Sequence, residues 1–338
     1  MGGMVTEKQG LAQLRLRDLL NMWENKGQIF SIYDLKSIDS DLEFAKSPQF
    51  LLVNNHPVFY FTSQKKDSSG KWVSYPYWAR FNSSFSTVTD FSRQSILEKS
   101  SLGAFDEHGI FPFSPVKIDK KYLAYTTGWS RRKSVDIEMS IGLSTSNDGL
   151  NFKRMSTGPI MSSSVNEPFL VGDAFVRKYD NFFFMWYIFG DKWLNPEEGG
   201  DPQRRYRIAQ AVSEDGLNWL RKGEYIICVK DRNECQALPS VVFFRNKYHM
   251  AFCYRDMFDF RSGGEGAYKL GYASSTDLEN WVRDDSFFNS ISDRTTWDAS
   301  MQCYPNLFVF DDSLYCAYNG NEFGKSGFGL AKCTDLNR

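Results

Sequence analysis

The sequence has few residues suited to metal centres and no long apolar segment. It contains only three His among 338 residues, and its Cys show no Cys-x-x-Cys spacing, so we expect no structural zinc site. No apolar run reaches the ~18 residues of a membrane span, and the first residues lack the apolar stretch of a secretory signal. The net charge of −1 gives no basis for nucleic acid or an anionic membrane as a partner.

The cysteines point to a reducing compartment. All six lie between Cys228 and Cys333, and Cys253 and Cys316 fall inside apolar segments expected to be strands. Free Cys in such segments packs as a small apolar residue. Together with the missing signal segment, this predicts a reduced, cytoplasmic protein.

What the sequence has in abundance is aromatic residues, at 16%, and a repeated turn. Residues 146–152 read SNDGLNF, residues 213–219 read SEDGLNW, residues 275–281 read STDLENW, and residues 333–337 begin a fourth copy. Asp-Gly supplies a positive-φ turn between two antiparallel strands, so we assign Asp148, Asp215 and Asp277 to turns. A repeat of about 60 residues without a helical pattern indicates a toroid of β-sheets.

Pairs of apolar segments joined by short polar links lie between the turns, as expected for hairpins. The five pairs span residues 48–61, 115–125, 174–187, 239–254 and 305–318. We therefore predict an all-β fold, a five-bladed β-propeller of four-stranded antiparallel blades over residues 41–338. Residues 1–40 are expected to form an N-terminal extension with a short helix over residues 11–23, where apolar residues have near-helical spacing.

An acidic residue precedes the first strand of four successive blades. These candidate catalytic acids are Asp106, Glu167, Glu234 and Asp298. In a propeller the first strand of each blade lines the channel, and the antiparallel second strand returns to the same face. The acids and the loops after the second strands should therefore share one mouth. A single acid of this kind is equally suited to bind backbone N–H groups at a strand entry, so the structural alternative stays open.

The segments around that mouth supply aromatic rings and hydrogen-bond donors. The candidate substrate-binding residues are His108, Trp129, Trp193, Arg205, Arg255, Asn319 and Asn321. Flat aromatic faces, bidentate donors and paired carboxylates together indicate a carbohydrate site with glycosidic chemistry.

The period, the Asp-Gly-x-x-Trp turns and the acids resemble the five-bladed β-propeller glycosidases, which include arabinanases, xylosidases, fructan hydrolases and mannoside phosphorylases. In the fructan-type enzymes the general acid is a Glu followed by Cys, and Glu234-Cys235 is similar. Their transition-state stabiliser lies in Arg-Asp-Pro one blade earlier, where this chain has Asn166-Glu167-Pro168. Their N-terminal Asn-Asp-Pro-Asn-Gly motif is absent. The resemblance thus implies Glu234 as the acid, leaves Asp106 or Asp298 for the second role, and does not imply fructan hydrolysis.

The sequence therefore predicts an enzyme that cleaves or transfers a glycosidic bond with a pair of carboxylates. Its expected partner is a carbohydrate, either an oligosaccharide or a bacterial surface-glycan precursor. Hydrolysis, phosphorolysis and transglycosylation stay open. In phosphorolysis the phosphate would be bound by one of four arginines: Arg131, Arg132, Arg205 or Arg255. The alternative is a non-catalytic glycan-binding propeller. No cofactor is expected, and a cation such as calcium in the central channel is left open.

Overall fold

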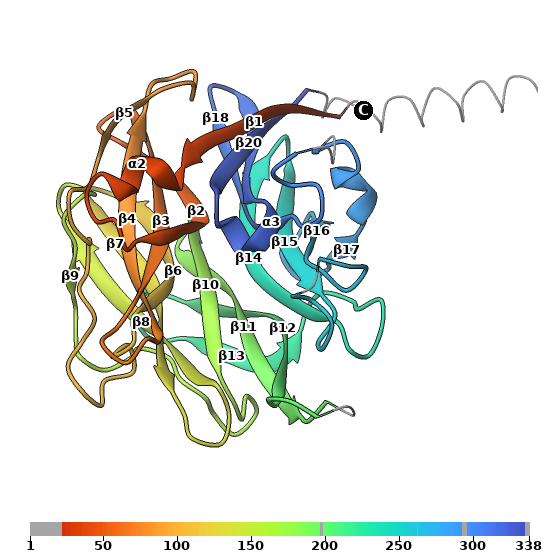
Figure 1. Cartoon of the computed structure of the whole chain (residues 1–338). Coiled ribbons are helices and arrows are strands. Elements are labelled where there is room, and N and C mark those ends of the chain that lie inside the picture. Colours follow the sequence, from red (N-terminus) through yellow and green to blue (C-terminus); the bar gives the residue numbers. More distant parts are fainter. Residues whose placement is uncertain (1–21, 197–198, 262, 293–295, 335–338) are drawn as a thin grey trace, which may run out of the picture.

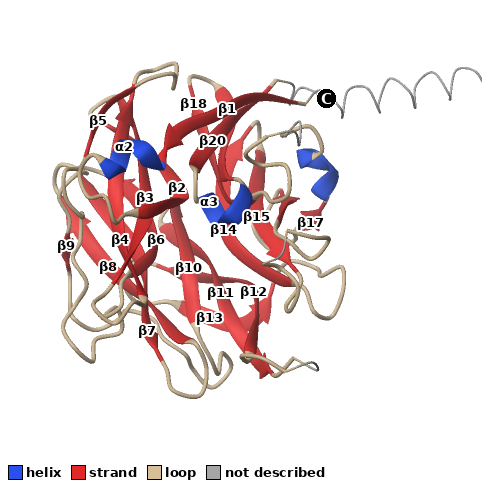
Figure 2. Ribbon diagram, in the orientation of Figure 1, coloured by secondary structure: helices blue, strands red, loops and turns tan. Residues whose placement is uncertain are grey.

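The computed structural model is a ring of five β-sheets, each with four antiparallel strands (Figure 1). It describes residues 22–196, 199–261, 263–292 and 296–334. Figure 2 shows how strongly strands dominate over the few short helices. The predicted five-bladed, four-stranded propeller is confirmed.

Four of the blades follow the chain order from the channel outward. The first blade contains β2 (Glu43–Val53), β3 (His56–Lys66), β4 (Trp72–Phe81) and β5 (Val88–Phe91). The second contains β6 (Ile110–Ile118), β7 (Lys121–Arg131), β8 (Ile137–Ser146) and β9 (Lys153–Arg154). The third contains β10 (Val171–Tyr179), β11 (Phe182–Leu194), β12 (Gln203–Ser213) and β13 (Leu220–Tyr225). The fourth contains β14 (Cys235–Phe244), β15 (Lys247–Arg255), β16 (Lys269–Ser275) and β17 (Val282–Arg283).

The fifth blade joins the two ends of the described chain. It consists of β18 (Cys303–Phe310), β19 (Ser313–Asn319), β20 (Gly327–Cys333) and β1 (Trp23–Ser31). The N-terminal strand β1 pairs antiparallel with β20, and the two lie side by side in Figure 1. Backbone hydrogen bonds therefore close the ring. Residues 1–40, expected as an extension, contribute this strand to the propeller.

The described part of the chain has three short helices outside the five sheets. They are α2 (Ile32–Lys36), η1 (Asp285–Phe288) and α3 (Asn321–Gly324). The Ser31 hydroxyl caps α2 by accepting a hydrogen bond from the Tyr33 N–H, which explains why the helix begins directly after β1. A short helix near the N-terminus is thus present. The helix predicted over residues 11–23 lies outside the described residues, except that Trp23 begins β1.

The repeated turn has the same geometry in three blades, each time between the third and fourth strands. The first Ser of each copy accepts a hydrogen bond over 2.9 Å from the N–H of Gly149, Gly216 or Leu278. These three residues have φ values of 77°, 74° and 65°, as the turn prediction requires. The fourth copy, at residues 335–337, lies outside the described residues.

The turns also contact the preceding blade. The Tyr125 hydroxyl on β7 donates to the Gly216 carbonyl over 2.9 Å, and Gln210 on β12 donates to the Leu278 carbonyl over 3.1 Å. The Tyr60 hydroxyl on β3 donates to the Gly149 carbonyl. Each turn thus serves both as a hairpin end and as a link between blades.

A register irregularity interrupts every innermost strand near its N-terminal end. The residues at these irregularities are Lys46, Phe111, Asp173, Leu238 and Tyr304. Asp173, Leu238 and Tyr304 have positive φ values of 55°, 49° and 57°. A bulge re-aims a side chain, and all five of these side chains line one cavity at the end of the channel.

Candidate active site

The cavity at the propeller mouth has a volume of about 460 Å³. Besides the bulge residues, its walls come from the C-terminal ends of second strands and the N-terminal ends of third strands, as expected if these segments share one mouth. Aromatic rings dominate these walls, among them Phe111, Trp129, Tyr206, Tyr268, Tyr304 and Phe323. Such a lining suits the faces of sugar rings.

Asp173 supplies the one carboxyl among the described residues that line the cavity. Its side chain is 5% exposed, and its Oδ2 accepts a hydrogen bond from the Leu238 N–H over 3.2 Å. Its own N–H donates to Thr127 Oγ1 over 2.7 Å, which fixes the bulge. Burial raises the pKa of Asp173 to about 7, although the Leu238 N–H and the charge of Arg204 act in the opposite direction.

Three cationic residues line the same cavity: Lys46, Arg204 and Arg261. Lys46 Nζ donates to Gln64 Oε1 over 2.7 Å, and burial lowers the pKa of Lys46 to about 8. Arg204 has a carboxylate neighbour in Asp136, at 3.7 Å. The cavity therefore carries more positive than negative charge among its described residues.

The four predicted catalytic acids are buried at the blade entries and are not among the described lining residues of the cavity. Three of them pair with an Arg on the outermost strand of their own blade. These pairs are Asp106 with Arg154 at 2.8 Å, Glu167 with Arg221 at 2.5 Å, and Glu234 with Arg283 at 2.7 Å. Asp298 accepts a hydrogen bond from the Tyr318 hydroxyl over 2.7 Å. The regular spacing of these acids in the sequence thus corresponds to a contact repeated within the blades.

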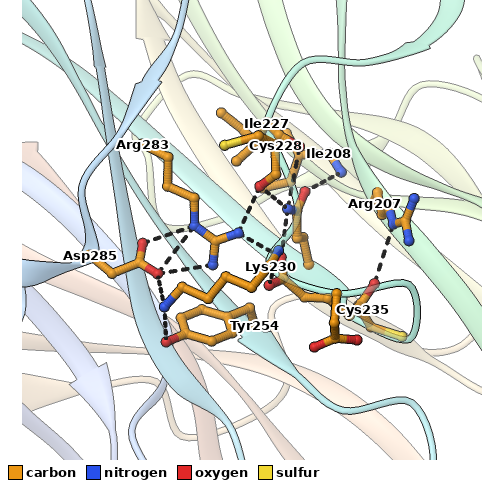
Figure 3. Close-up of polar contacts among 12 residues, drawn as sticks. Arg207, Ile208, Ile227, Cys228, Lys230, Cys235, Tyr254, Arg283 and Asp285 are labelled. Carbon is orange, nitrogen blue, oxygen red and sulfur yellow. Dashed lines mark hydrogen bonds and ion pairs between the residues drawn. The ribbon is translucent and has the colours of Figure 1, made fainter.

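Glu234 lies in a dense polar network on the fourth blade. Its Oε1 accepts from Gln236 over 2.8 Å and from Arg283 over 2.7 Å, while its Oε2 accepts from the Lys230 N–H over 3.1 Å. Asp285 in turn pairs with both Arg283 and Lys230, as Figure 3 shows. The catalytic role of Glu234 stays a prediction, and its surroundings are those of a buried structural ion pair.

The predicted aromatic and His residues lie close to the cavity. Trp129 lines it and donates from Nε1 to Ser74 Oγ over 2.6 Å. His108 stacks on Trp129 with a ring separation of 5.7 Å, and burial lowers the pKa of His108. Trp193 packs against Arg204, which lies 5.8 Å from its ring. Trp129 is the member of the predicted binding set found among the described lining residues.

The remaining predicted binding residues make protein contacts. Arg205 binds Asp191 through two hydrogen bonds of 2.6 and 2.9 Å. Asn319 is buried and donates to the Ala45 and Gly327 carbonyls, which joins the fifth blade to the first. Asn321 Oδ1 accepts from the Ser300 and Met301 N–H groups.

Arg255 is also buried and lies against the hydroxyls of two tyrosines that line the cavity. Its Nε is 3.2 Å from Tyr206 Oη and 3.2 Å from Tyr268 Oη. The two hydroxyls are 3.0 Å apart. The Arg255 guanidinium therefore lies directly behind the tyrosines that form this part of the cavity wall.

Four charged residues of the cavity were not predicted from the sequence: Asp173, Lys46, Arg204 and Arg261. Asp173 directly precedes the apolar run that is predicted as the first strand of its blade, and it belongs to no repeated motif. The signal that could have found it is a charged residue at the bulge position, which holds Phe111, Leu238 and Tyr304 in three other blades and Lys46 in the first. A polar residue at such a position is costly unless it has a function or a partner.

No protein-family model matches the chain. It is 29% identical over 247 residues to an uncharacterized protein of Mycobacterium tuberculosis, which covers 72% of this chain and 78% of that protein. It is 26% identical over 163 residues to a 1,2-beta-oligomannan phosphorylase of Thermoanaerobacter sp.. That match covers 47% of this chain and 45% of the phosphorylase.

Solved structures match nearly the whole ring. A BT0996–RGII complex has a TM-score of 0.69 at 14% identity, covering 96% of this protein and 96% of its own length. A glycoside hydrolase has a TM-score of 0.64 at 14% identity, covering 91% of this chain and 97% of its own. A beta-1,2-mannobiose phosphorylase from Listeria innocua has a TM-score of 0.63 at 12% identity, covering 92% and 96%. The chain has the fold of the five-bladed β-propeller glycosidases and phosphorylases.

The predicted pair of catalytic carboxylates stays a prediction, and the described residues that line the cavity include one carboxyl, that of Asp173. Among the described residues, no group of three or more His, Cys, Asp or Glu is arranged to hold a metal ion. None of the helices in the described ranges is long and apolar enough to cross a membrane.

Proposed function

We propose that the chain is an enzyme that breaks or transfers a glycosidic bond in the central cavity, with Asp173 as the general acid. The observation that carries this proposal is the buried Asp173 carboxyl, which a bulge directs into an aromatic-lined cavity. With a pKa of about 7, a large share of Asp173 is protonated at neutral pH, as proton donation to a leaving oxygen requires.

The reaction balances with this one acid. The bond between the anomeric carbon and the leaving oxygen breaks, and that oxygen takes the proton of Asp173. The anomeric carbon forms a new bond to an oxygen of phosphate, water or an acceptor sugar, and this nucleophile releases a proton. The Asp173 carboxylate then takes up a proton, which restores the acid for the next turnover.

The single carboxyl favours phosphate as the nucleophile over water. Water needs a second carboxylate as a base or a covalent intermediate, whereas phosphate is already anionic and needs no base. Lys46 on the first blade adds a positive charge at the cavity wall that favours an approaching anion. The similarity to two phosphorylases supports the same route.

A second candidate is a glycan-binding propeller without catalysis, and the absence of a second carboxyl among the described lining residues favours it. Both candidates are tested by an NMR time course on a panel of oligosaccharides, with and without phosphate. The proteins are wild type, Asp173→Asn and Glu234→Gln. Phosphate-dependent turnover that Asp173→Asn abolishes supports the enzyme. Binding of a glycan by wild type and Asp173→Asn alike, with no turnover by either, supports the binding module.

A further inference from the structure

Three arginines gather where the third and fourth blades meet the cavity. Arg204 and Arg261 line the cavity, and Arg255 lies behind its tyrosines. Arg204 and Arg255 lie 5.9 and 5.2 Å from the Tyr206 ring. Arg255 and Arg261 lie 3.6 and 4.2 Å from the Phe260 ring. Burial and the charges of Arg204 and Arg255 lower the pKa of Arg261. The three guanidinium groups therefore form one cluster.

This cluster is short of negative charge. Within the described residues, its carboxylate contact is Asp136, 3.7 Å from Arg204. Arg261 donates to the neutral Gln203 amide oxygen over 3.4 Å. Arg255 is 3% exposed and donates to tyrosine hydroxyls and to the carbonyls of Asp256 and Met257. Arg255 is buried, Arg204 is half-buried and Arg261 is exposed. A buried cation such as Arg255 is normally paired with an anion, so the cluster has capacity for a negatively charged group at the cavity surface.

The Nε atom of Arg204 also indicates that the cluster can bind an anion. The Nε of Arg204 is buried and has no hydrogen-bond partner among the described residues. A guanidinium carries five donors in a planar fork that matches a phosphoryl or carboxylate group. Arg204 thus lines the cavity, and one of its donors has no partner within the described structure.

The position of the arginine cluster relative to Asp173 indicates which part of the substrate the cluster can bind. Asp173 on β10 and Arg204 on β12 belong to the same blade and line the same cavity. The positive charge of Arg204 also acts on Asp173. Arg204 therefore lies near the acid that would protonate the leaving oxygen. A nucleophile attacks the anomeric carbon from the opposite face of the sugar ring. The cluster is therefore suited to an anion on the leaving group rather than to an attacking phosphate.

The aromatic rings around the cluster place this anion inside the sugar-binding surface. Arg204 lies 5.9 Å from the Tyr206 ring, and Arg255 lies 3.6 Å from the Phe260 ring. Arg261 lies 4.2 Å from the same Phe260 ring. A charged substituent on a ring stacked here would reach the guanidinium groups without leaving the cavity.

We propose that the sugar on the leaving-group side carries a phosphoryl or carboxylate group, which Arg204 and Arg261 bind with Arg255 behind them. This assignment rests on the proposed function and names its substrate class, an anionic glycan. It assigns no role to free phosphate at the arginine cluster.

The test measures binding by calorimetry. The ligands are glucose and mannose, their 1- and 6-phosphates, their uronates, and inorganic phosphate alone. We expect at least one anionic sugar to bind about tenfold to a hundredfold more tightly than its neutral parent. Arg204→Gln and Arg261→Gln should lose this preference. The matched control is Arg207→Gln, which should keep the preference for the anionic sugar. Arg207 lies three residues from Arg204 on β12 and donates to the Arg232 and Glu234 carbonyls. Melting temperatures confirm that each variant is folded.

The proposal is wrong if no anionic sugar binds more tightly than its neutral parent, or if the preference survives in Arg204→Gln. Equal binding of inorganic phosphate alone and of the sugar phosphates would assign the cluster to a free anion and also overturn it. Asp173→Asn should keep or strengthen anion binding while losing turnover. Turnover of neutral glycosides that depends on Asp173 but not on Arg204 would leave the proposed function standing without this substrate class.

Discussion

Arg283 donates to the Glu234 carboxylate over 2.7 Å and thereby joins the outermost strand of the fourth blade to the segment that enters its innermost strand. Both side chains are almost completely buried, with exposures of 5% and 2%. The second and third blades repeat the contact with Asp106 and Arg154, and with Glu167 and Arg221. A carboxylate held in this way stabilises its blade whether or not it also serves a reaction.

The first prediction is that Glu234→Gln destabilises the protein. The variant leaves the buried Arg283 charge with Asp285 alone, and breaking a buried pair costs about 3–5 kcal/mol. Urea unfolding measures this loss. Arg132→Gln removes an exposed pair with Glu138 and, as a control, should cost no more than about 1 kcal/mol. Unchanged stability together with lost turnover would instead support the catalytic role that the sequence predicts for Glu234.

The second prediction concerns Lys46, whose pKa falls to about 8 because burial penalises its charge. The unfolded chain holds this proton up to a pH near 10.5, so charging Lys46 in the folded state costs stability at all pH values below about 8. Lys46→Met should therefore stabilise the protein by about 1–3 kcal/mol at pH 7. The gain should shrink as the pH rises from 8 to 10. A gain that is the same at pH 7 and pH 10 would contradict the assigned pKa.

The third prediction is a pH-dependent stabilisation by Asp173→Asn. The folded-state pKa of Asp173 is raised from 3.8 to about 7, so the folded state binds the proton more tightly than the unfolded state. The stability that this proton provides is full below pH 4 and is lost as the pH rises through 7. The variant should thus gain on the order of 4 kcal/mol over wild type at pH 8 and much less at pH 4. Thermal unfolding across this range measures the difference, and an equal effect at both pH values would refute it.

The repeat explains why the sequence predicts the fold so well. Residues 213–219 carry their own turn chemistry, because the Asp215 side chain accepts from the N–H groups of Leu217 and Asn218 within the same segment. Local hydrogen bonds of this kind can be predicted from a short stretch of sequence. The closure of the ring by β1 and β20 cannot be predicted in this way, because it pairs residues 23–31 with residues 327–333, which lie near the two ends of the sequence.

The site is harder to predict because the chemistry of an acid depends on distant partners. Three of the four blade-entry acids are followed by an Arg partner, after 48, 54 and 49 residues, and that second periodicity could have indicated a structural pair. Asp173 has no motif of its own. The role proposed for Asp173 depends on a bulge and on the burial that raises its pKa, and both arise only when the five blades assemble.

The most direct test of the central claim is the pH profile of turnover by wild type and Asp173→Asn, on any substrate that the oligosaccharide panel identifies. We predict that kcat/KM of wild type falls as the pH rises through about 7, because the acid loses its proton. Asp173→Asn, folded and still able to bind the glycan, should lose about 10²–10⁴-fold in kcat. A folded Asp173→Asn variant with the wild-type rate and pH profile would contradict the assignment of Asp173 as the general acid.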